Sequence, residues 1–289
     1  MSDLIFITGA TGNVGAEIVR QLSELEHHVR VAQRNLHSSS NWSPSSTVEY
    51  VNFDFKQPQT FAKAFQGVKR VFLMRPPALS QVKTYMYPAI DSAIASGVEQ
   101  IVFLSVLGAE SNSIIPHAKV EKYIQSVGIP YTFLRASFFM QNLSTIHRQD
   151  IQRNEIFLPA GKGKTSFIDV RDIAAVAVKA LTESGHSDRS YSLTGSEALD
   201  YYQVAEIFTE VLVKPVLYTN PSIVKFASSM YKRGLEPQFI AVMIGIYTTA
   251  KLGLAGKLTT DTQEILQRAP ISLRQFVEDY RGCWLEPIS

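Results

Sequence analysis

The feature that most constrains the fold of this chain is its first turn. The segment LIFITGATGNVGAEIVRQL runs from Leu4 to Leu22 and begins with an apolar stretch that predicts a buried strand. Three glycines follow, Gly9, Gly12 and Gly15, and an amphipathic stretch that predicts a helix comes directly after them. Glycine adopts positive φ and lets the backbone approach a phosphate, and a helix N-terminus offers free N–H groups to an anion. The segment therefore predicts a dinucleotide-binding turn, provided that parallel strands surround it.

The glycine spacing by itself is a weak indication, and a tight turn without a ligand is the alternative interpretation. The spacing is GxxGxxG rather than the GxGxxG of many dehydrogenases, and no Gly-Lys-Ser/Thr follows, which excludes a P-loop. Thr11 and Asn13 add short polar side chains at the mouth of the turn. The prediction of a ligand-binding turn is strengthened because this turn is the first strand–helix connection of a series.

Apolar strand-like stretches alternate with helix-like stretches through the first half of the chain. Several strand-like stretches are continuously apolar, as expected when helices cover both faces of a sheet. Strand followed by helix, repeated in order, predicts a parallel doubly wound sheet, and hence an α/β Rossmann fold. The expected strands are 4–9, 28–34, 48–54, 70–77, 100–106 and 130–137, and the expected helices are 16–25, 61–68, 86–98 and 117–128.

The regular alternation of strands and helices does not continue into the second half of the chain. We expect residues 1–143 to form an NAD(P)-binding Rossmann domain, with 165–195 returning to it. Residues 144–164 and 196–289 are expected to form a smaller, mostly helical lobe. Open α/β sheets bind ligands at the carboxyl ends of their strands, so this lobe is expected on the substrate side.

The composition limits the kinds of partner. The 289 residues carry a net charge of +2, which gives no general attraction to nucleic acid or to an anionic membrane. The longest apolar run, FIAVMIGIY at 239–247, is too short to cross a bilayer. A single cysteine, Cys283, cannot form an internal disulfide and favours a reducing, cytoplasmic location. We therefore expect a small-molecule partner, and a monomer or a homodimer.

The end of the second expected strand indicates which nucleotide would bind. NAD binders carry an acidic residue there for the ribose 2′-hydroxyl, and this chain has Arg34 instead. A guanidinium suits a 2′-phosphate, and the hydroxyls of Ser38, Ser39 and Ser40 can add donors. The chain is therefore expected to prefer NADP(H) to NAD(H), with a solvated arginine beside a loop as the alternative.

Residues that follow the third and fourth expected strands would run along the same cofactor. Asp54 and Phe55 are expected beside the adenine, and Met74 and Arg75 along the middle of the dinucleotide. Both pairs stand at the carboxyl end of a strand, where open α/β sheets bind ligands. The four residues are therefore candidate cofactor contacts.

The acid–base residues of short-chain dehydrogenases are missing from their expected place. Those enzymes use Tyr-x-x-x-Lys on the helix after the fifth strand, where the lysine lowers the pKa of the tyrosine. The one match, from Tyr247 to Lys251, lies far from that helix in the chain and is interpreted as coincidence. His117 stands at the start of the expected helix and is the candidate catalytic residue, as a proton donor to a carbonyl, quinone or imine. A histidine that only contacts the cofactor or faces solvent is the alternative.

Three polar residues near His117 are weaker candidates. Ser105, at the end of the fifth expected strand, can hydrogen-bond the cofactor or substrate, or merely cap a helix. Lys119 and Glu121 are interpreted as solvated helix positions. The sequence contains no HExxH motif, cysteine pair or Gly-x-Ser-x-Gly elbow, so neither a metal site nor a serine hydrolase is expected.

Several segments, taken in order, resemble one known family. They are GATGNVG, VAQRN, FLSVLGAE, HAKVEKYIQSVGIPYTFLRASFFMQNL, SFIDVRDIAAVAVKAL and YSLTGSEALDYYQVAEI. Together they cover nearly the whole chain and resemble the NmrA-like group of atypical short-chain dehydrogenases. That group includes NADPH-dependent quinone and azo reductases, ergot-alkaloid reductases, and NADP-sensing regulators without known turnover.

The resemblance implies an extended Rossmann fold with a small C-terminal lobe. It also implies a set of cofactor contacts, of which the last four residues would line the nicotinamide end. The implied contacts are Gly9, Ala10, Thr11, Gly12, Asn13, Val14, Arg34, Asp54, Phe55, Met74, Arg75 and His117, followed by Phe139, Met140, Gln141 and Asn142.

The residues and the resemblance favour an NADPH-dependent reductase that transfers hydride to a small, flat, conjugated acceptor such as a quinone. A quinone is electrophilic and needs little acid assistance, so the missing tyrosine and lysine do not exclude hydride transfer. The alternative is a catalytically silent NADP(H)-sensing regulator, in which the lobe or the loop 37–47 changes a protein contact. A sugar-nucleotide epimerase is a third interpretation, which the missing acid–base pair weakens.

Overall fold

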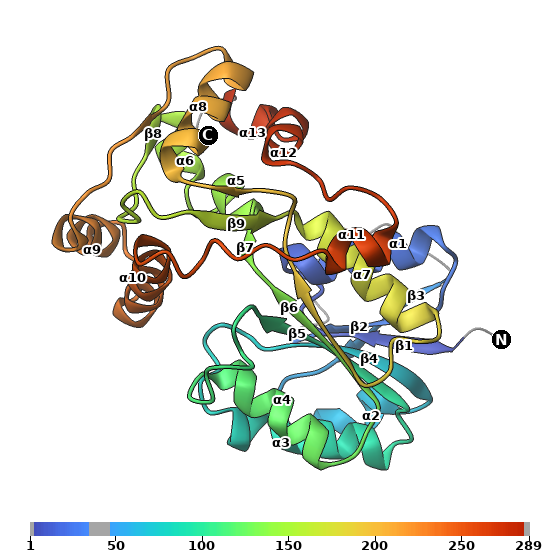
Figure 1. Cartoon of the computed structure of the whole chain (residues 1–289). Helices are drawn as coiled ribbons and strands as arrows, with labels where there is room; N and C mark the ends of the chain where they lie inside the picture. Colours follow the sequence, from blue (N-terminus) through green and yellow to red (C-terminus); the bar gives the residue numbers. More distant parts are fainter. Residues whose placement is uncertain (1–2, 35–46, 286–289) are drawn as a thin grey trace. The chain divides into compact units, whose positions relative to one another are not determined.

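The computed structural model describes residues 3–34 and 47–285 of the chain. Ser38, Ser39 and Ser40, and nearly all of the loop 37–47, lie outside these ranges. The chain divides into two compact units (Figure 1). The first contains Met1–Ala136 and Val170–Leu193, and the second contains Ser137–Asp169 and Thr194–Ser289. Residues 170–193 therefore return to the first unit after the chain has entered the second.

The first unit is built on a parallel sheet, as the alternating sequence pattern predicted. The sheet has seven strands, because the returning segment 170–193 adds one to the six expected. The strand order reverses between β1 and β4, and this is the point where doubly wound sheets bind ligands. From one edge to the other the strands are β10 (Arg189–Leu193), β6 (Tyr131–Ala136), β5 (Gln100–Val106), β4 (Val68–Met74), β1 (Leu4–Ile7), β2 (Val29–Gln33) and β3 (Val48–Asn52).

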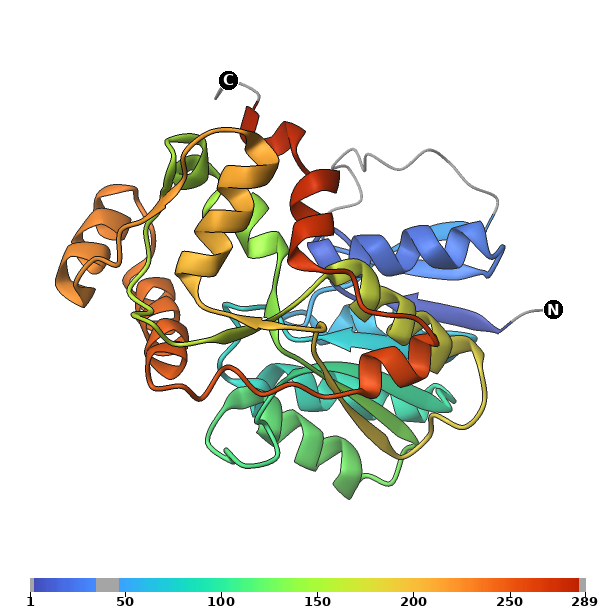
Figure 2. The same cartoon turned by 45° about the horizontal axis from the view of Figure 1, so that its top comes forward.

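Helices cover both faces of this sheet, which explains why its strands are so apolar (Figures 1 and 2). On one face α1 (Asn13–Glu24) packs against α7 (Val170–Thr182). The other face carries η1 (Pro58–Thr60), α2 (Phe61–Phe65), α3 (Val82–Ala95) and α4 (Pro116–Ser126).

An aromatic cluster lies between the sheet and the helices α2 and α3. The ring of Phe6 on β1 meets Phe53 at 5.2 Å and Phe65 at 5.1 Å, both edge to face. Such pairs contribute about 0.5–1.5 kcal/mol beyond the area they bury. The strand β1, which leads into the first turn, is therefore packed into an aromatic core.

The second unit is mostly helical and contains two small sheets. The strands β7 (Phe138–Phe139), β9 (Thr165–Ile168) and β11 (Ala198–Leu199) form one sheet, and β8 (Glu155–Ile156) pairs with β12 (Leu217–Tyr218). Its helices are α5 (Gln141–Ser144), α6 (Arg148–Gln152), α8 (Tyr201–Leu212), α9 (Ile223–Lys232), α10 (Pro237–Lys251), α11 (Asp261–Leu266), α12 (Leu273–Asp279) and α13 (Gly282–Leu285).

Local capping signals explain where some of these helices begin. The Asp200 side chain accepts hydrogen bonds from the first turn of α8, and Gln203 bonds back to the Asp200 backbone. Pro237 occupies the first position of α10, where its missing N–H costs nothing. No helix in residues 3–34 and 47–285 combines the length and apolar character needed to cross a membrane.

Candidate functional site

The first turn lies between β1 and α1, and the fold requires glycine at two of its three glycine positions. Gly9 has a φ of +67°, and a Cβ added there would lie 2.1 Å from Cε of Met74. A Cβ at Gly15 would lie 2.3 Å from the carbonyl oxygen of Gly9, which is backbone and cannot turn away. The fold itself therefore requires glycine at both positions.

Gly12 differs because the fold does not require a glycine there. Its backbone is extended, with φ −97° and ψ 171°, which any residue adopts. An added Cβ would lie 3.4 Å from the Gly9 carbonyl oxygen and 3.9 Å from Met74 Cε, which are ordinary contacts. A bare backbone at this position leaves room for an outside group, as expected for a turn that receives a phosphate.

The N-terminus of α1 is free to bind an anion. Gly12 is its N-cap residue, no side chain of the described residues caps it, and its first turn carries no acidic residue. Helix N-termini carry partial positive charge and unpaired N–H groups. Thr11 and Asn13 are exposed beside this end, whereas Ala10 and Val14 are buried beneath it. These residues fit the pyrophosphate of a dinucleotide.

The residues expected near the adenosine have distinct environments. Arg34, directly after β2, is exposed. Oδ1 of Asp54 accepts a hydrogen bond of 2.9 Å from the backbone N–H of Lys56. The ring of Phe55 is buried and meets Phe53 edge to face at 4.9 Å. Arg34 is thus available to a ligand, while the ring of Phe55 is part of the core.

Met74 connects the first turn to the next strand. Its backbone N–H donates to Oγ1 of Thr8 over 2.8 Å, and this hydroxyl donates to the carbonyl of Phe72 over 3.1 Å. The Met74 side chain lies against Gly9. The carboxyl ends of β1 and β4 are therefore joined at the switch point of the sheet.

Arg75 follows Met74 and is held by its own loop. Its Nη1 donates to the carbonyls of Pro76 at 3.0 Å, Pro77 at 3.0 Å and Leu79 at 2.9 Å. Its Nε donates to Nε2 of His117 over 3.4 Å. Burial lowers the pKa of Arg75, which still stays protonated at neutral pH. Within residues 3–34 and 47–285, no carboxylate pairs with this guanidinium.

His117 is partly buried in the first turn of α4, beside Arg75 and the ring of Phe103. Burial first, and the nearby Arg75 cation second, lower the pKa of His117 to about 4. The imidazole is therefore neutral at pH 7, and it can donate one hydrogen bond and accept one.

The expectation that Glu121 is a solvated helix position is wrong, because its side chain is buried. It lies one turn after His117 on α4 and is 4% exposed. Its carboxylate accepts hydrogen bonds from Ser105 Oγ at 2.5 Å and from Arg135 Nε and Nη2 at 3.1 and 2.7 Å. The helical spacing from Ala118 and to Ile124 places Glu121 on the buried stripe of α4, and that spacing was the missed signal.

The Ser105 hydroxyl thus donates its hydrogen bond to Glu121. Ser105 itself is 1% exposed at the end of β5. The hydrogen bond with Glu121 raises the pKa of Arg135, and Glu110 adds a contact of 3.5 Å to the same guanidinium. Serine, carboxylate and guanidinium join β5, α4 and β6 beneath His117.

Phe139, Met140, Gln141 and Asn142 begin the second unit. Met140 and Gln141 are buried, whereas Phe139 and Asn142 are half-buried. Gln141 Nε2 donates to Oδ1 of Asp169 over 2.9 Å, and the Met140 N–H donates to the Ile168 carbonyl over 2.9 Å. The proposed contacts of these four residues with the nicotinamide stay predictions.

A buried polar network in the second unit was not foreseen. Nε2 of His147 lies 2.5 Å from the hydroxyl of Tyr247, and His147 Nδ1 faces Oδ2 of Asp150 at 4.0 Å. Arg233 closes the network with two hydrogen bonds to Asp150, of 2.6 and 3.0 Å. Tyr247 is thus bonded to His147, while Lys251 is exposed at the end of α10. No sequence spacing predicts the contact between His147 and Tyr247, because they lie far apart in the chain.

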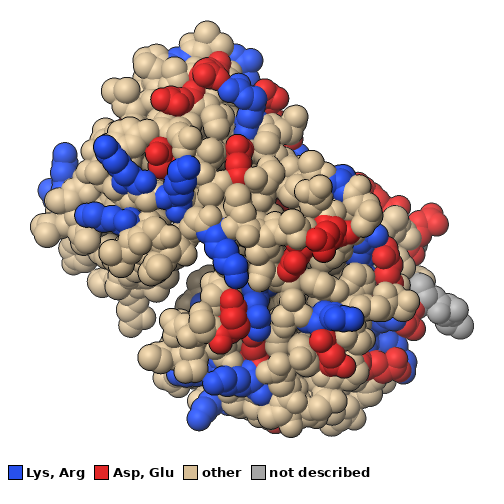
Figure 3. Space-filling view, in the orientation of Figure 1, with Lys and Arg blue, Asp and Glu red and all other residues tan. Residues whose placement is uncertain are grey.

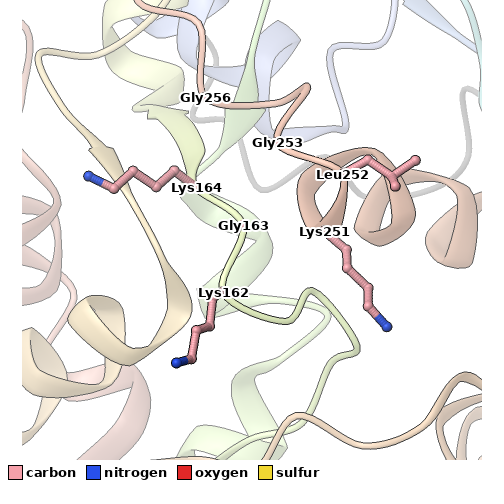
Figure 4. A pocket seen from close by; sticks show the side chains of 7 residues that line it. All are labelled: Lys162, Gly163, Lys164, Lys251, Leu252, Gly253 and Gly256. Carbon is pink, nitrogen blue, oxygen red and sulfur yellow. The ribbon is translucent and has the colours of Figure 1, made fainter.

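A pocket of about 570 Å³ lies at the C-terminal end of α10 (Figure 4). The ammonium groups of its three lysines point in different directions, and Figure 3 shows the basic side chains of this unit scattered on its surface. Lys251 lies in the last turn of α10, where a cation is favourable beside the free carbonyls of the helix C-terminus. The lining residues are Lys162, Gly163, Lys164, Lys251, Leu252, Gly253 and Gly256.

No group of three His, Cys, Asp or Glu side chains in the described part of the chain can hold a metal ion. The first unit instead assembles the groups that a dinucleotide needs. They are an open glycine turn, an uncapped helix N-terminus, an exposed arginine after β2 and an arginine without a carboxylate partner after β4.

Known proteins resemble this chain over nearly its full length. An NAD(P)H azoreductase of Xenophilus azovorans is 31% identical over 262 residues, which cover 89% of this chain and 91% of the azoreductase. Quinone oxidoreductase 2 of Escherichia coli is 28% identical over 247 residues, which cover 83% of this chain and 85% of the oxidoreductase. The structure of the triphenylmethane reductase of a Citrobacter species, complexed with NADP(H), is 25% identical and superposes with a TM-score of 0.83, covering 96% of this chain and 99% of the reductase.

A family model agrees with these relatives. The model of the NmrA-like family matches residues 1–248, which include the glycine turn, Arg75, His117 and the Ser105–Glu121–Arg135 network. The match extends well beyond half of the chain, so this chain belongs to the NmrA-like family.

Proposed function

We propose that this chain is an NAD(P)H-dependent reductase that prefers NADPH and transfers hydride to a small conjugated acceptor such as a quinone. The observation that carries the proposal is the open backbone at Gly12, on the uncapped N-terminus of α1. An added Cβ would meet only ordinary contacts there, so a bound phosphate gives the reason for a glycine. Relatives named as an azoreductase, a quinone oxidoreductase and a reductase complexed with NADP(H) support the same activity.

The residues of the first unit have distinct proposed roles toward the cofactor. The first turn holds the pyrophosphate, and the exposed guanidinium of Arg34 binds the 2′-phosphate that distinguishes NADPH from NADH. Met74 follows the middle of the dinucleotide, and Arg75, beside His117, lies toward the nicotinamide end. The bound dihydronicotinamide supplies hydride, and the protein contributes orientation and exclusion of water.

The class of acceptor follows from which side chains of the site can donate a proton. The pKa of His117 is lowered to about 4, so no imidazolium is present at neutral pH to act as a strong acid. The hydroxyl of Ser105 is bonded to Glu121. A site with weak acids suits an electrophilic acceptor, whose reduced form carries negative charge easily, and a quinone meets this requirement.

The test is oxidation of NADPH by the purified protein with a panel of quinones, azo dyes and enones, followed by the absorbance of the reduced nicotinamide. NADH is run alongside, and the Gly12→Val variant serves as the control without a phosphate site. Turnover that depends on both the acceptor and Gly12, and prefers NADPH, would support the proposal. Tight binding of NADPH without turnover of any acceptor would favour a regulator that senses NADP(H).

A further inference from the structure

The contact between Arg75 and His117 determines which nitrogen of the imidazole carries the proton. An arginine side chain donates hydrogen bonds and never accepts them. Nε of Arg75 faces Nε2 of His117 at 3.4 Å, so Nε2 must be the acceptor and carries no proton. A neutral imidazole has one N–H, and in His117 this N–H is therefore at Nδ1.

Both groups keep a donor for a ligand. In the part of the chain that the structure describes, no group accepts a hydrogen bond from Nδ1 of His117 or from Nη2 of Arg75. The Arg75 guanidinium is half-buried without a carboxylate, and a cation removed from water in this way is stabilised by a negatively charged partner.

The helix that carries His117 adds to the positive potential. α4 spans Pro116–Ser126, its N-cap residue is Ile115, and no described side chain caps it. Its first turn contains no acidic residue, and His117 is its second residue. The helix N-terminus, a fixed guanidinium and an imidazole N–H thus occur together at the carboxyl ends of β4 and β5.

We propose that Arg75 and His117 together form an oxyanion site for the acceptor. Arg75 holds His117 as the Nδ1–H tautomer, and Nη2 of Arg75 and Nδ1–H of His117 stabilise the charge that hydride addition places on an acceptor oxygen. Such preorganised donors stabilise a transition state because they require no reorientation during the reaction. His117 then acts as a neutral electrophile and not as an imidazolium acid.

The inference rests on the proposed reductase function and specifies its acceptor chemistry. Hydride, released with both electrons of its C–H bond in NADPH, forms one new bond to a carbonyl-conjugated acceptor, whose carbonyl π electrons move onto oxygen. NADPH is oxidised to NADP⁺ and the acceptor is reduced by two electrons. The oxyanion takes its proton from water after hydride has arrived. The acceptors that fit are quinones and other conjugated carbonyl compounds.

The first test measures the tautomer without any turnover. Long-range ¹H–¹⁵N correlation spectra of the histidine rings, with His117→Gln to assign the signal, should show a neutral Nδ1–H imidazole from about pH 8 down to about pH 5. Arg75→Met should let His117 exchange between tautomers and titrate about one unit or more higher. An Nε2–H tautomer, or titration near about 6.5 in the unchanged protein, would overturn the proposal.

Arg70→Met is the matched control for Arg75→Met. Arg70 lies on β4 at the opposite end from Arg75, and its Nη1 likewise donates to a backbone carbonyl, that of Leu181. Its replacement removes one guanidinium from the strand that Arg75 follows and should leave the His117 signal unchanged. Arg75→Lys keeps the positive charge but loses the fixed Nε donor, so it should keep His117 neutral while the tautomers mix.

The second test probes the oxyanion site with 4-nitrophenol, a coloured phenol that resembles a reduced quinone, in the presence of NADP⁺. The bound probe should ionise more readily than the free probe, with its pKa lowered by about one unit, or tenfold in the ionisation constant. Arg75→Met should abolish this shift, and Arg70→Met should preserve it. Binding as the neutral phenol, an unchanged shift in Arg75→Met, or no binding would each overturn the oxyanion site.

Different results would remove the reductase function and the oxyanion site. Turnover of quinones without preferential binding of the phenolate would leave the reductase function standing and remove the oxyanion site. Phenolate binding that depends on Arg75, together with no turnover of any acceptor, would leave the oxyanion site and remove the proposed function.

Discussion

The hydroxyl of Tyr247 lies 2.5 Å from Nε2 of His147, although the two residues are 100 positions apart in the chain. Both side chains are buried, and the ring of Tyr247 also packs edge to face on Phe226. Burial raises the pKa of Tyr247 well above its usual value, so the hydroxyl stays protonated within its hydrogen bond to His147. This bond ties α10 to the segment between α5 and α6 within the second unit.

Removing that hydroxyl should destabilise the second unit. Tyr247→Phe leaves Nε2 of His147 buried without its hydrogen-bond partner, which costs about 1–3 kcal/mol in the free energy of unfolding. The measurement is denaturant unfolding of the variant and the unchanged protein. Tyr231→Phe is the control, because Tyr231 on α9 is 66% exposed. Equal midpoints for the two variants would mean that the buried bond contributes nothing.

The glycines of the first turn should separate binding from folding. Gly12→Val should abolish NADPH binding, and Gly12→Ala should keep the melting temperature close to that of the unchanged protein, since its added Cβ meets only ordinary contacts. Gly15→Ala should lower the melting temperature strongly, because its Cβ would lie 2.3 Å from a backbone oxygen. Calorimetry and NADPH fluorescence titration give the two quantities. NADPH binding to folded Gly12→Val at the original affinity would show that the turn is not the phosphate site.

Arg34 should determine the choice between the two nucleotides. Arg34→Ala should weaken NADPH binding about tenfold to a hundredfold, because a charge-assisted hydrogen bond contributes about 1.5–3 kcal/mol. NADH lacks the 2′-phosphate, so its binding should hardly change. The dissociation constants of both nucleotides are measured for the variant and for Arg153→Ala, an exposed arginine in the second unit. Equal losses for NADPH and NADH would contradict a role in 2′-phosphate recognition.

The buried carboxylate of Glu121 should be needed for stability. Glu121→Gln leaves the Arg135 guanidinium, whose side chain is only 16% exposed, without its main partner. Breaking a buried pair from one side costs about 3–5 kcal/mol in the free energy of unfolding. Removing both charges in Glu121→Gln with Arg135→Met should cost less than the sum of the single changes, as a double-mutant cycle measures. Lys122→Gln, an exposed neighbour on α4, is the control, and strict additivity would mean that the two charges do not interact.

His117 should contribute to loss of stability in acid. Its pKa is lowered in the folded protein from 6.5 to about 4, so between these values the unfolded chain binds the extra proton and the folded chain does not. Stability therefore falls as the pH drops from about 6.5 to about 4, by about 3 kcal/mol at most. Below that range both states are protonated and the loss is complete.

Denaturant unfolding at several pH values checks this. His117→Gln should make stability less dependent on pH across the range, whereas His28→Gln, which removes an exposed histidine, should leave the dependence unchanged. An unaltered pH dependence in His117→Gln would show that His117 is not held neutral in the folded state.

The strand and helix order of the first unit was predictable because its causes are local. Continuous apolar runs such as QIVFLSV require burial on both faces, and the glycine turn requires a strand before it and a helix after it. These two facts predicted the parallel sheet, its first turn and the position of His117 at the start of α4.

The tertiary structure alone decided how the polar side chains are used. The sequence placed Glu121 on a helix, but only the approach of β5 and β6 to that helix explains a buried carboxylate between Ser105 and Arg135. In the same way, Arg75 touches His117 because the loop after β4 and the start of α4 meet at the carboxyl end of the sheet. The amino-acid sequence determines local periodicity and backbone freedom. The ionisation and hydrogen bonding of a side chain depend on residues that only folding brings within a few ångströms, so they follow from the packed structure.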